Sequence, residues 1–102
     1  MNSKLKDENI DYLFSAIMQL KSIEECYDFF ADLCTVPELK AMEQRFEVAK
    51  LLNDGLIYND ILEKTGASSA TISRVNRSLN YGTGAYREIF ARLKDEDAEE
   101  TP

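Results

Sequence analysis

Apolar residues recur at helical spacing along almost the whole chain, and no segment shows the alternation of polar and apolar residues that is typical of a strand. The first helix is predicted over about residues 8–20, with an apolar face made of Ile10, Leu13, Phe14, Ile17 and Met18. The two prolines, Pro37 and Pro102, lie near a predicted helix start and at the chain end, so little interrupts helical structure. We therefore expect an all-α fold.

Two capping-box pairs predict where the next helices begin. In such a pair, a serine or threonine oxygen accepts a backbone N–H of the first turn, and a glutamate three residues later reaches back. Ser22 and Glu25 predict the start of a second helix. Thr35 and Glu38 predict the start of a third helix, which should run to about Asn53.

Residues 63–79 have the pattern of a helix-turn-helix. Gly66 can adopt the left-handed conformation that ends one helix and begins a sharp turn, and Ser68 can cap the helix that follows. That second helix has an apolar stripe of Ile72, Val75 and Leu79. Its opposite side carries Ala70, Ser73, Arg74 and Arg77.

The polar side of this helix suits the major groove of DNA. Short side chains let the backbone approach the duplex, hydroxyl groups can meet phosphates or base edges, and arginine can bind guanine or phosphate. We expect the DNA-contacting set from this helix to be Ser68, Ser69, Ala70, Thr71, Ser73, Arg74 and Arg77. Any amphipathic helix has a polar outer face, however, so the charge distribution also has to agree.

Charge is distributed unevenly along the chain. The 102 residues carry a net charge of -7, which by itself argues against a nucleic-acid partner. Residues 64–94 nevertheless contain six basic residues and one acidic residue, and this basic block includes the expected recognition helix. Counterion release would favour phosphate binding there. We expect residues 1–94 to form the helical DNA-binding domain and residues 95–102, with five acids, a disordered acidic tail.

Composition argues against several other function classes. The chain has no histidine, no glycine-rich phosphate loop and no CxxC motif, so we expect neither an enzyme nor a metal or cofactor site. The apolar runs are short and the first residues lack the apolar region of a signal peptide, so we expect no membrane segment and a cytoplasmic location. Cys26 and Cys34 are expected to be reduced.

The first two predicted helices carry more large apolar residues than a subunit of this size can easily cover. They include Tyr27, Phe29 and Phe30. An intertwined homodimer would bury them and could place two recognition helices about 34 Å apart, as a palindromic site requires. The alternative is that these residues pack on the helix-turn-helix within one subunit.

Several segments resemble the tryptophan repressor superfamily. They are Val36-Pro37-Glu38 through Arg45, Leu51-Leu52 before Gly55, Gly66-Ala67, Ala70-Thr71-Ile72-Ser73-Arg74 and Ser78-Leu79. The run NRSLNYG at 76–82 resembles the YerC/YecD group of TrpR-like proteins. The resemblance spans about residues 10–94. It implies a six-helix subunit in an intertwined homodimer, with the fourth and fifth helices reading DNA.

The resemblance also implies particular site residues. It supports the recognition-helix contacts and adds Tyr58 and Asn59 at the start of the preceding helix. The effector pocket of the family is matched by Arg45, Arg74 and Ser78. Val75, however, stands where the repressor has glycine, and its branched side chain would narrow that pocket. We therefore do not expect tryptophan as effector; Arg45 and Arg74 either bind a different small anionic ligand or contact DNA and neighbouring carboxylates.

Together these patterns predict a transcriptional regulator, expected to be a repressor, that reads a palindromic operator on double-stranded DNA as a homodimer. The alternative is a helical protein-interaction module without specific DNA binding. Its anchor would be Tyr81, Tyr86 and Phe90, around the NYGTG loop at 80–84. Packing of Tyr86, Ile89, Phe90 and Leu93 into a dimer core is the competing role for this segment.

Overall fold

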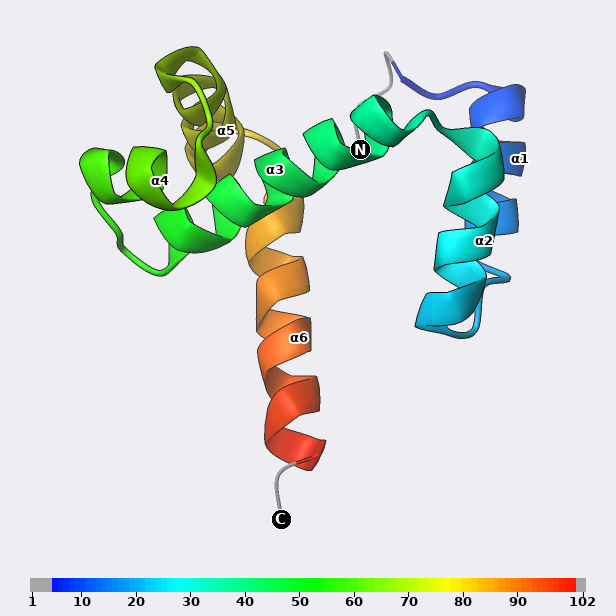
Figure 1. Cartoon of the computed structure of the whole chain (residues 1–102). Helices are drawn as coiled ribbons and strands as arrows, with labels where there is room; N and C mark the ends of the chain where they lie inside the picture. Colours follow the sequence, from blue (N-terminus) through cyan, green and yellow to red (C-terminus); the bar gives the residue numbers. More distant parts are fainter. Residues whose placement is uncertain (1–4, 101–102) are drawn as a thin grey trace. The chain divides into compact units, whose positions relative to one another are not determined.

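The structure is a computed structural model that describes residues 5–100 and the side chains of residues 5–97. Over this range the chain forms six α-helices and no strand (Figure 1). The helices are α1 (Glu8–Ile17), α2 (Ile23–Leu33), α3 (Val36–Asn53), α4 (Tyr58–Thr65), α5 (Ser69–Tyr81) and α6 (Ala85–Glu100). The expected all-α architecture is confirmed. The chain divides between Lys40 and Ala41 into two compact parts.

In the N-terminal part, side chains cap both helices. Asp7 Oδ1 accepts from the Ile10 amide at 2.8 Å at the start of α1, and Ser22 Oγ accepts from the Glu25 amide at 3.1 Å at the start of α2. Helix α1 ends at Ile17, three residues earlier than predicted. The next residues form a tighter turn instead, with the Leu20 amide bound to the Ile17 carbonyl oxygen at 3.1 Å.

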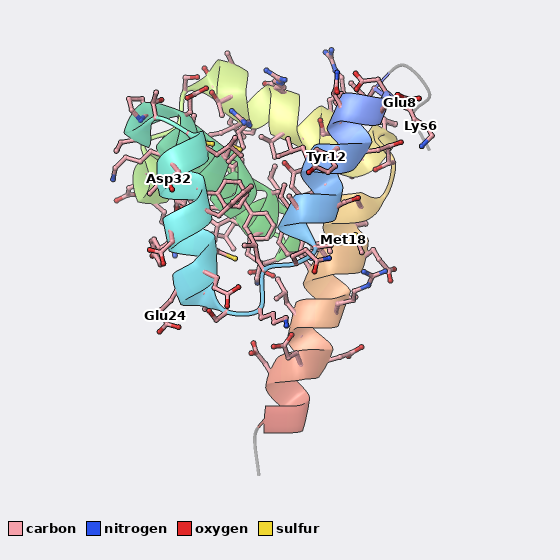
Figure 2. The ribbon with its side chains drawn as sticks, turned by 90° about the vertical axis from the view of Figure 1, so that its right-hand side faces the viewer. Lys6, Glu8, Tyr12, Met18, Glu24 and Asp32 are labelled. Atoms are coloured by element: carbon pink, nitrogen blue, oxygen red, sulfur yellow. The ribbon has the colours of Figure 1, made fainter. Side chains whose placement is uncertain are left out.

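Large apolar side chains of α1 and α2 are exposed in the single subunit. Tyr12 and Met18, labelled in Figure 2, are each 81% exposed. Phe14, Ile23 and Tyr27 are also exposed. Phe29 and Phe30 are half-buried and meet edge to face, with ring centroids 5.5 Å apart.

The predicted capping box at the start of α3 is present. The Thr35 amide donates to Glu38 Oε1 at 2.8 Å, and the Glu38 amide donates to Thr35 Oγ1 at 3.2 Å. Gly55, with φ of +90°, ends the helix. Its amide binds the Leu52 carbonyl oxygen at 3.0 Å, and the Leu56 amide binds the Leu51 carbonyl oxygen at 3.1 Å. The predicted end of α3 near Asn53 is therefore confirmed.

Lowering the pH should weaken the capping box. The pKa of Glu38 lies below its ordinary value of 4.5 because its carboxylate is hydrogen-bonded to the backbone amide and then to the side chain of Thr35. A lowered pKa in the folded chain stabilises the fold above the unfolded-state pKa, and this contribution disappears as pH falls through the folded-state value. We expect an NMR titration of the Glu38 carboxyl carbon to show a midpoint below 4.5.

A Glu38→Gln variant is the matched control for this effect, since glutamine keeps an acceptor oxygen but does not titrate. The stability advantage of the wild type over this variant should shrink between about pH 5 and pH 3. A midpoint at or above 4.5, or a stability difference independent of pH, would contradict the expectation.

The core of the C-terminal part is built by α3, α4, α5 and α6. Its buried residues are Val48, Ala49, Ile61, Ala67, Ile72, Val75, Leu79 and Phe90. The predicted apolar stripe of α5 is confirmed, because Ile72 is 0% exposed, Val75 2% and Leu79 5%. Burial of this stripe turns the opposite side of α5 toward solvent.

Helix α6 extends past the point where the sequence predicted a tail. It runs to Glu100, into the segment 95–102 that the sequence predicted to be a disordered acidic tail, and residues 101–102 lie outside the described residues. Alanine and glutamate in this segment are good helix formers and allow the helix to continue.

In the part of the chain that is described, no helix has the length and apolarity needed to cross a membrane.

Candidate nucleic-acid interface

A short turn joins α4 to α5 and sets the geometry of the candidate interface. Gly66 lies in the left-handed region with φ of 68°, and its amide binds the Leu62 carbonyl oxygen. Thr65 Oγ1 accepts from the Ala67 amide at 3.1 Å. Gln44 Nε2 of α3 donates to the Thr65 carbonyl oxygen at 3.3 Å and so ties the turn to α3. The predicted role of Gly66 as the helix end is confirmed.

Ser68 caps α5 as predicted, and the proton of its hydroxyl group is used within the first turn of the helix. Ser68 Oγ accepts from the Thr71 amide at 3.1 Å and donates to Thr71 Oγ1 at 3.0 Å. These two hydrogen bonds give Ser68 a structural role in the first turn of α5. Thr71 is half-buried beneath this cap, whereas Ser69 and Ala70 are exposed.

The two arginines of α5 are available to a partner. Arg74 and Arg77 are exposed, and neither has a hydrogen bond or ion pair within residues 5–97. They lie on the same outward side as Ala70 and Ser73. This surface, which combines small residues at the start of the helix with two uncompensated cations, can meet both base edges and phosphates.

Tyr58, at the first position of α4, is bound to α5. Its hydroxyl group donates to the Ser69 carbonyl oxygen at 2.9 Å and is also hydrogen-bonded to Ser73 Oγ. Asn59 beside it is exposed and has no such bond among the described residues. Tyr58 thus links the two helices, a role that the sequence did not indicate because the bonded residues are 11 and 15 positions apart.

The residues that resemble an effector pocket are not brought into one cavity. Ser78 lines an apolar cavity of about 400 Å³ together with Phe46, Gly82, Thr83, Ala85, Tyr86 and Ile89. Val75 is instead buried in the core, Arg74 is exposed and Arg45 is half-buried on α3. Neither arginine lines the cavity.

The carboxylates around Arg45 do not pair with it. No ion pair joins Arg45 to Glu43 or Glu47 within the described side chains. The pKa of Glu47 is raised by burial first, and then by a hydrogen bond and charge repulsion with Glu43. An ion-paired arginine, which the sequence left open for Arg45, is therefore not found here.

Arg87 forms a bridge that sequence reasoning missed. Its Nη1 donates to Asn53 Oδ1 of α3 at 3.0 Å, and its Nη2 donates to Asn80 Oδ1 of α5 at 2.9 Å. Asn80 in turn donates to the Asn76 side chain at 2.9 Å. The guanidinium group thus connects three helices, α3, α5 and α6, and is engaged with the protein. Arg92, also in the basic block, pairs with Glu88 at 3.1 Å.

The aromatic residues near the NYGTG loop separate into two environments. Phe46, Tyr86 and Phe90 form a ring cluster, with the centroids of Phe46 and Phe90 5.1 Å apart. Phe90 is buried and Tyr86 half-buried, so they pack within the C-terminal part. Tyr81 is 86% exposed. Of the three residues expected to form an aromatic anchor, Tyr81 is therefore the one that lies on the surface.

Within the described residues, no cluster of three or more histidine, cysteine or acidic side chains could hold a metal ion. Cys26 and Cys34 are half-buried and not bridged.

A family profile and a curated relative match nearly the whole chain. The profile described as "Trp repressor protein" matches residues 8–94. The protein "Uncharacterized protein YerC" of Bacillus subtilis (strain 168) is 50% identical over 96 residues, which make up 94% of this chain and 92% of the relative.

Two solved structures share the arrangement of helices. A TrpR-like protein from Eubacterium eligens ATCC 27750 is 57% identical with a TM-score of 0.88, covering 91% of this chain and 96% of the other. A Trp repressor candidate from Staphylococcus aureus is 48% identical with a TM-score of 0.88, covering 92% and 95%. The all-α TrpR-like fold and the resemblance to the YerC group, both expected from the sequence, are confirmed.

Proposed function

Because the chain belongs to the Trp repressor family, we propose that it is a transcriptional repressor that binds double-stranded DNA in the cytoplasm. The observation that carries this proposal is the outward surface of α5. Its first turns present small side chains, and Arg74 and Arg77 are exposed and without partners in the described part of the chain. An α-helix with this surface fits the major groove.

The proposal includes a homodimer on a palindromic operator. Tyr12, Met18, Ile23 and Tyr27 are 69% or more exposed in the single subunit, and such a group of large apolar side chains favours association. Symmetric dimers place two identical helices on two half-sites. Catalysis has no part in this function.

Selection of DNA fragments tests the proposal directly. The purified full-length chain is incubated with fragmented genomic DNA from its source and with a randomised duplex library, and bound DNA is sequenced. We expect enrichment of a two-fold symmetric motif with half-sites about one helical turn apart. Sedimentation equilibrium should give the mass of two subunits. No enrichment over unrelated DNA, together with a monomeric mass, would contradict the proposal.

We further propose that tryptophan is not the effector. Val75 occupies core volume beside Ile72, and the cavity next to Ser78 is lined mainly by apolar groups, without Arg45 or Arg74. The charged groups of a free amino acid would lack partners there. Tryptophan should therefore leave operator affinity unchanged. If calorimetry showed that tryptophan binds, and operator affinity rose in its presence, this proposal would be refuted.

Arg87 should not contribute a phosphate contact, although it lies in the basic block. Its guanidinium group is bound to Asn53 and Asn80. We expect Arg87→Gln to leave the slope of log affinity against log salt unchanged, whereas Arg77→Gln should reduce it by about 0.9 per subunit. Fluorescence anisotropy titrations at several salt concentrations measure both slopes. An equal reduction in the two variants would contradict the assignment.

A further inference from the structure

The hydrogen bonds of the Tyr58 hydroxyl group, which lies between α4 and α5, determine whether Ser73 acts as donor or acceptor. A tyrosine hydroxyl has one proton, and Tyr58 donates it to the Ser69 carbonyl oxygen at 2.9 Å. The carbonyl oxygen of Ser69 can only accept a hydrogen bond. In the second hydrogen bond of Tyr58, with Ser73 Oγ, the tyrosine oxygen must therefore be the acceptor and Ser73 the donor.

Ser73 consequently has no proton to offer on the outside of α5. Its side chain is exposed on the fifth residue of the helix, on the same side as Ala70 and Arg77. What it presents to a partner is a pair of oxygen lone pairs. Phosphate oxygens, guanine O6 and N7, and thymine O4 are all acceptors, so none of them can bond to Ser73 in this state.

We infer that Ser73, polarised by Tyr58, selects an exocyclic amino group in the major groove at one position of each half-site. The amino groups that the major groove offers are adenine N6 and cytosine N4. This inference rests on the proposed function and names the chemistry that one of its residues recognises. Tyr58 acts through Ser73 and is a positioning residue.

Randomised duplex selection with matched variants tests the inference. The position that Ser73 contacts is the one whose preference disappears in Ser73→Ala. At that position the wild type should prefer adenine or cytosine over other bases by about 3- to 10-fold. Tyr58→Phe removes the hydroxyl that holds the Ser73 proton, so guanine and thymine should become accepted there. Tyr81→Phe, which removes an exposed hydroxyl from the far end of α5, should change nothing.

A modified base checks the same contact in the unaltered protein. Where adenine is preferred, it is replaced by purine, which lacks the 6-amino group; where cytosine is preferred, by 2-pyrimidinone, which lacks the 4-amino group. Wild-type affinity should fall by about 3- to 10-fold, and affinity of Ser73→Ala should not change. This measurement does not depend on the folding of Tyr58→Phe.

The outcomes separate the inference from the proposed function. A selected motif whose preference survives in Tyr58→Phe, a preferred guanine or thymine at the Ser73 position, or no change in Ser73→Ala overturns the inference and leaves DNA binding intact. Failure of the wild type to select any motif overturns the proposed function, and the inference with it.

Discussion

Replacing Arg74 and Arg77 together by glutamine should lower operator affinity by about 100-fold or more at physiological salt. Both side chains are exposed and have no partner in the described part of the chain, so their charge is available to DNA. In a homodimer four cations are removed. The slope of log affinity against log salt should therefore fall by about 3 to 4.

The fold should not suffer from this change. Exposed side chains without partners contribute little to folding, so the free energy of unfolding should stay within about 0.5 kcal/mol of the wild type. The matched control removes two exposed lysines elsewhere, in Lys21→Gln with Lys40→Gln. If this control lost as much affinity as the arginine variant, binding would depend on net charge alone. Unchanged affinity in a folded arginine variant would show that α5 does not contact DNA.

Replacing Ile72 by alanine should have the largest effect on stability, about 2 to 5 kcal/mol. Ile72 is 0% exposed and packs in the core of the C-terminal part beside Val75 and Ile61. Alanine would leave a cavity under α5, because the neighbouring helices can close over it only in part. The free energy of unfolding of small domains is about 5 to 15 kcal/mol, so this substitution would remove a large part of it.

Urea unfolding followed by circular dichroism measures this loss at fixed protein concentration, since a dimer unfolds in a concentration-dependent way. Ile72→Val is the conservative comparison and should cost about 0.5 to 1.5 kcal/mol. Ser69→Ala changes an exposed residue on the same helix and should cost about 0.5 kcal/mol or less. An Ile72→Ala variant as stable as Ser69→Ala would contradict the burial of this side chain.

Local features of the fold could be predicted because they depend on residues close in sequence. The Thr35 and Glu38 box, the glycine at position 66 and the Ser68 cap each involve a few neighbouring positions, and all are present. The apolar stripe of α5 follows from the helical period. The end of α1 at Ile17 was predicted less accurately, because the position of a helix end depends on small energy differences over its last turn.

Contacts between distant residues could not be predicted in the same way. The bond of Arg87 to Asn53 spans 34 positions, and only the packing of α6 against the end of α3 brings the two together. From composition alone, Arg87 counted as one more cation of the basic block. The Tyr58 bond to Ser73 likewise requires the α4 and α5 geometry, although the family resemblance had singled out both residues.

The Tyr58 bridge has a consequence for how operators are assigned among related regulators. Two relatives with identical residues at 69–81 but tyrosine in one and phenylalanine in the other at position 58 would favour different bases in the same half-site. Grouping such proteins by their recognition helices alone would then merge regulators with separate target genes. An evolving or engineered lineage could also change its targets by a single substitution in α4, without altering any residue that touches a base.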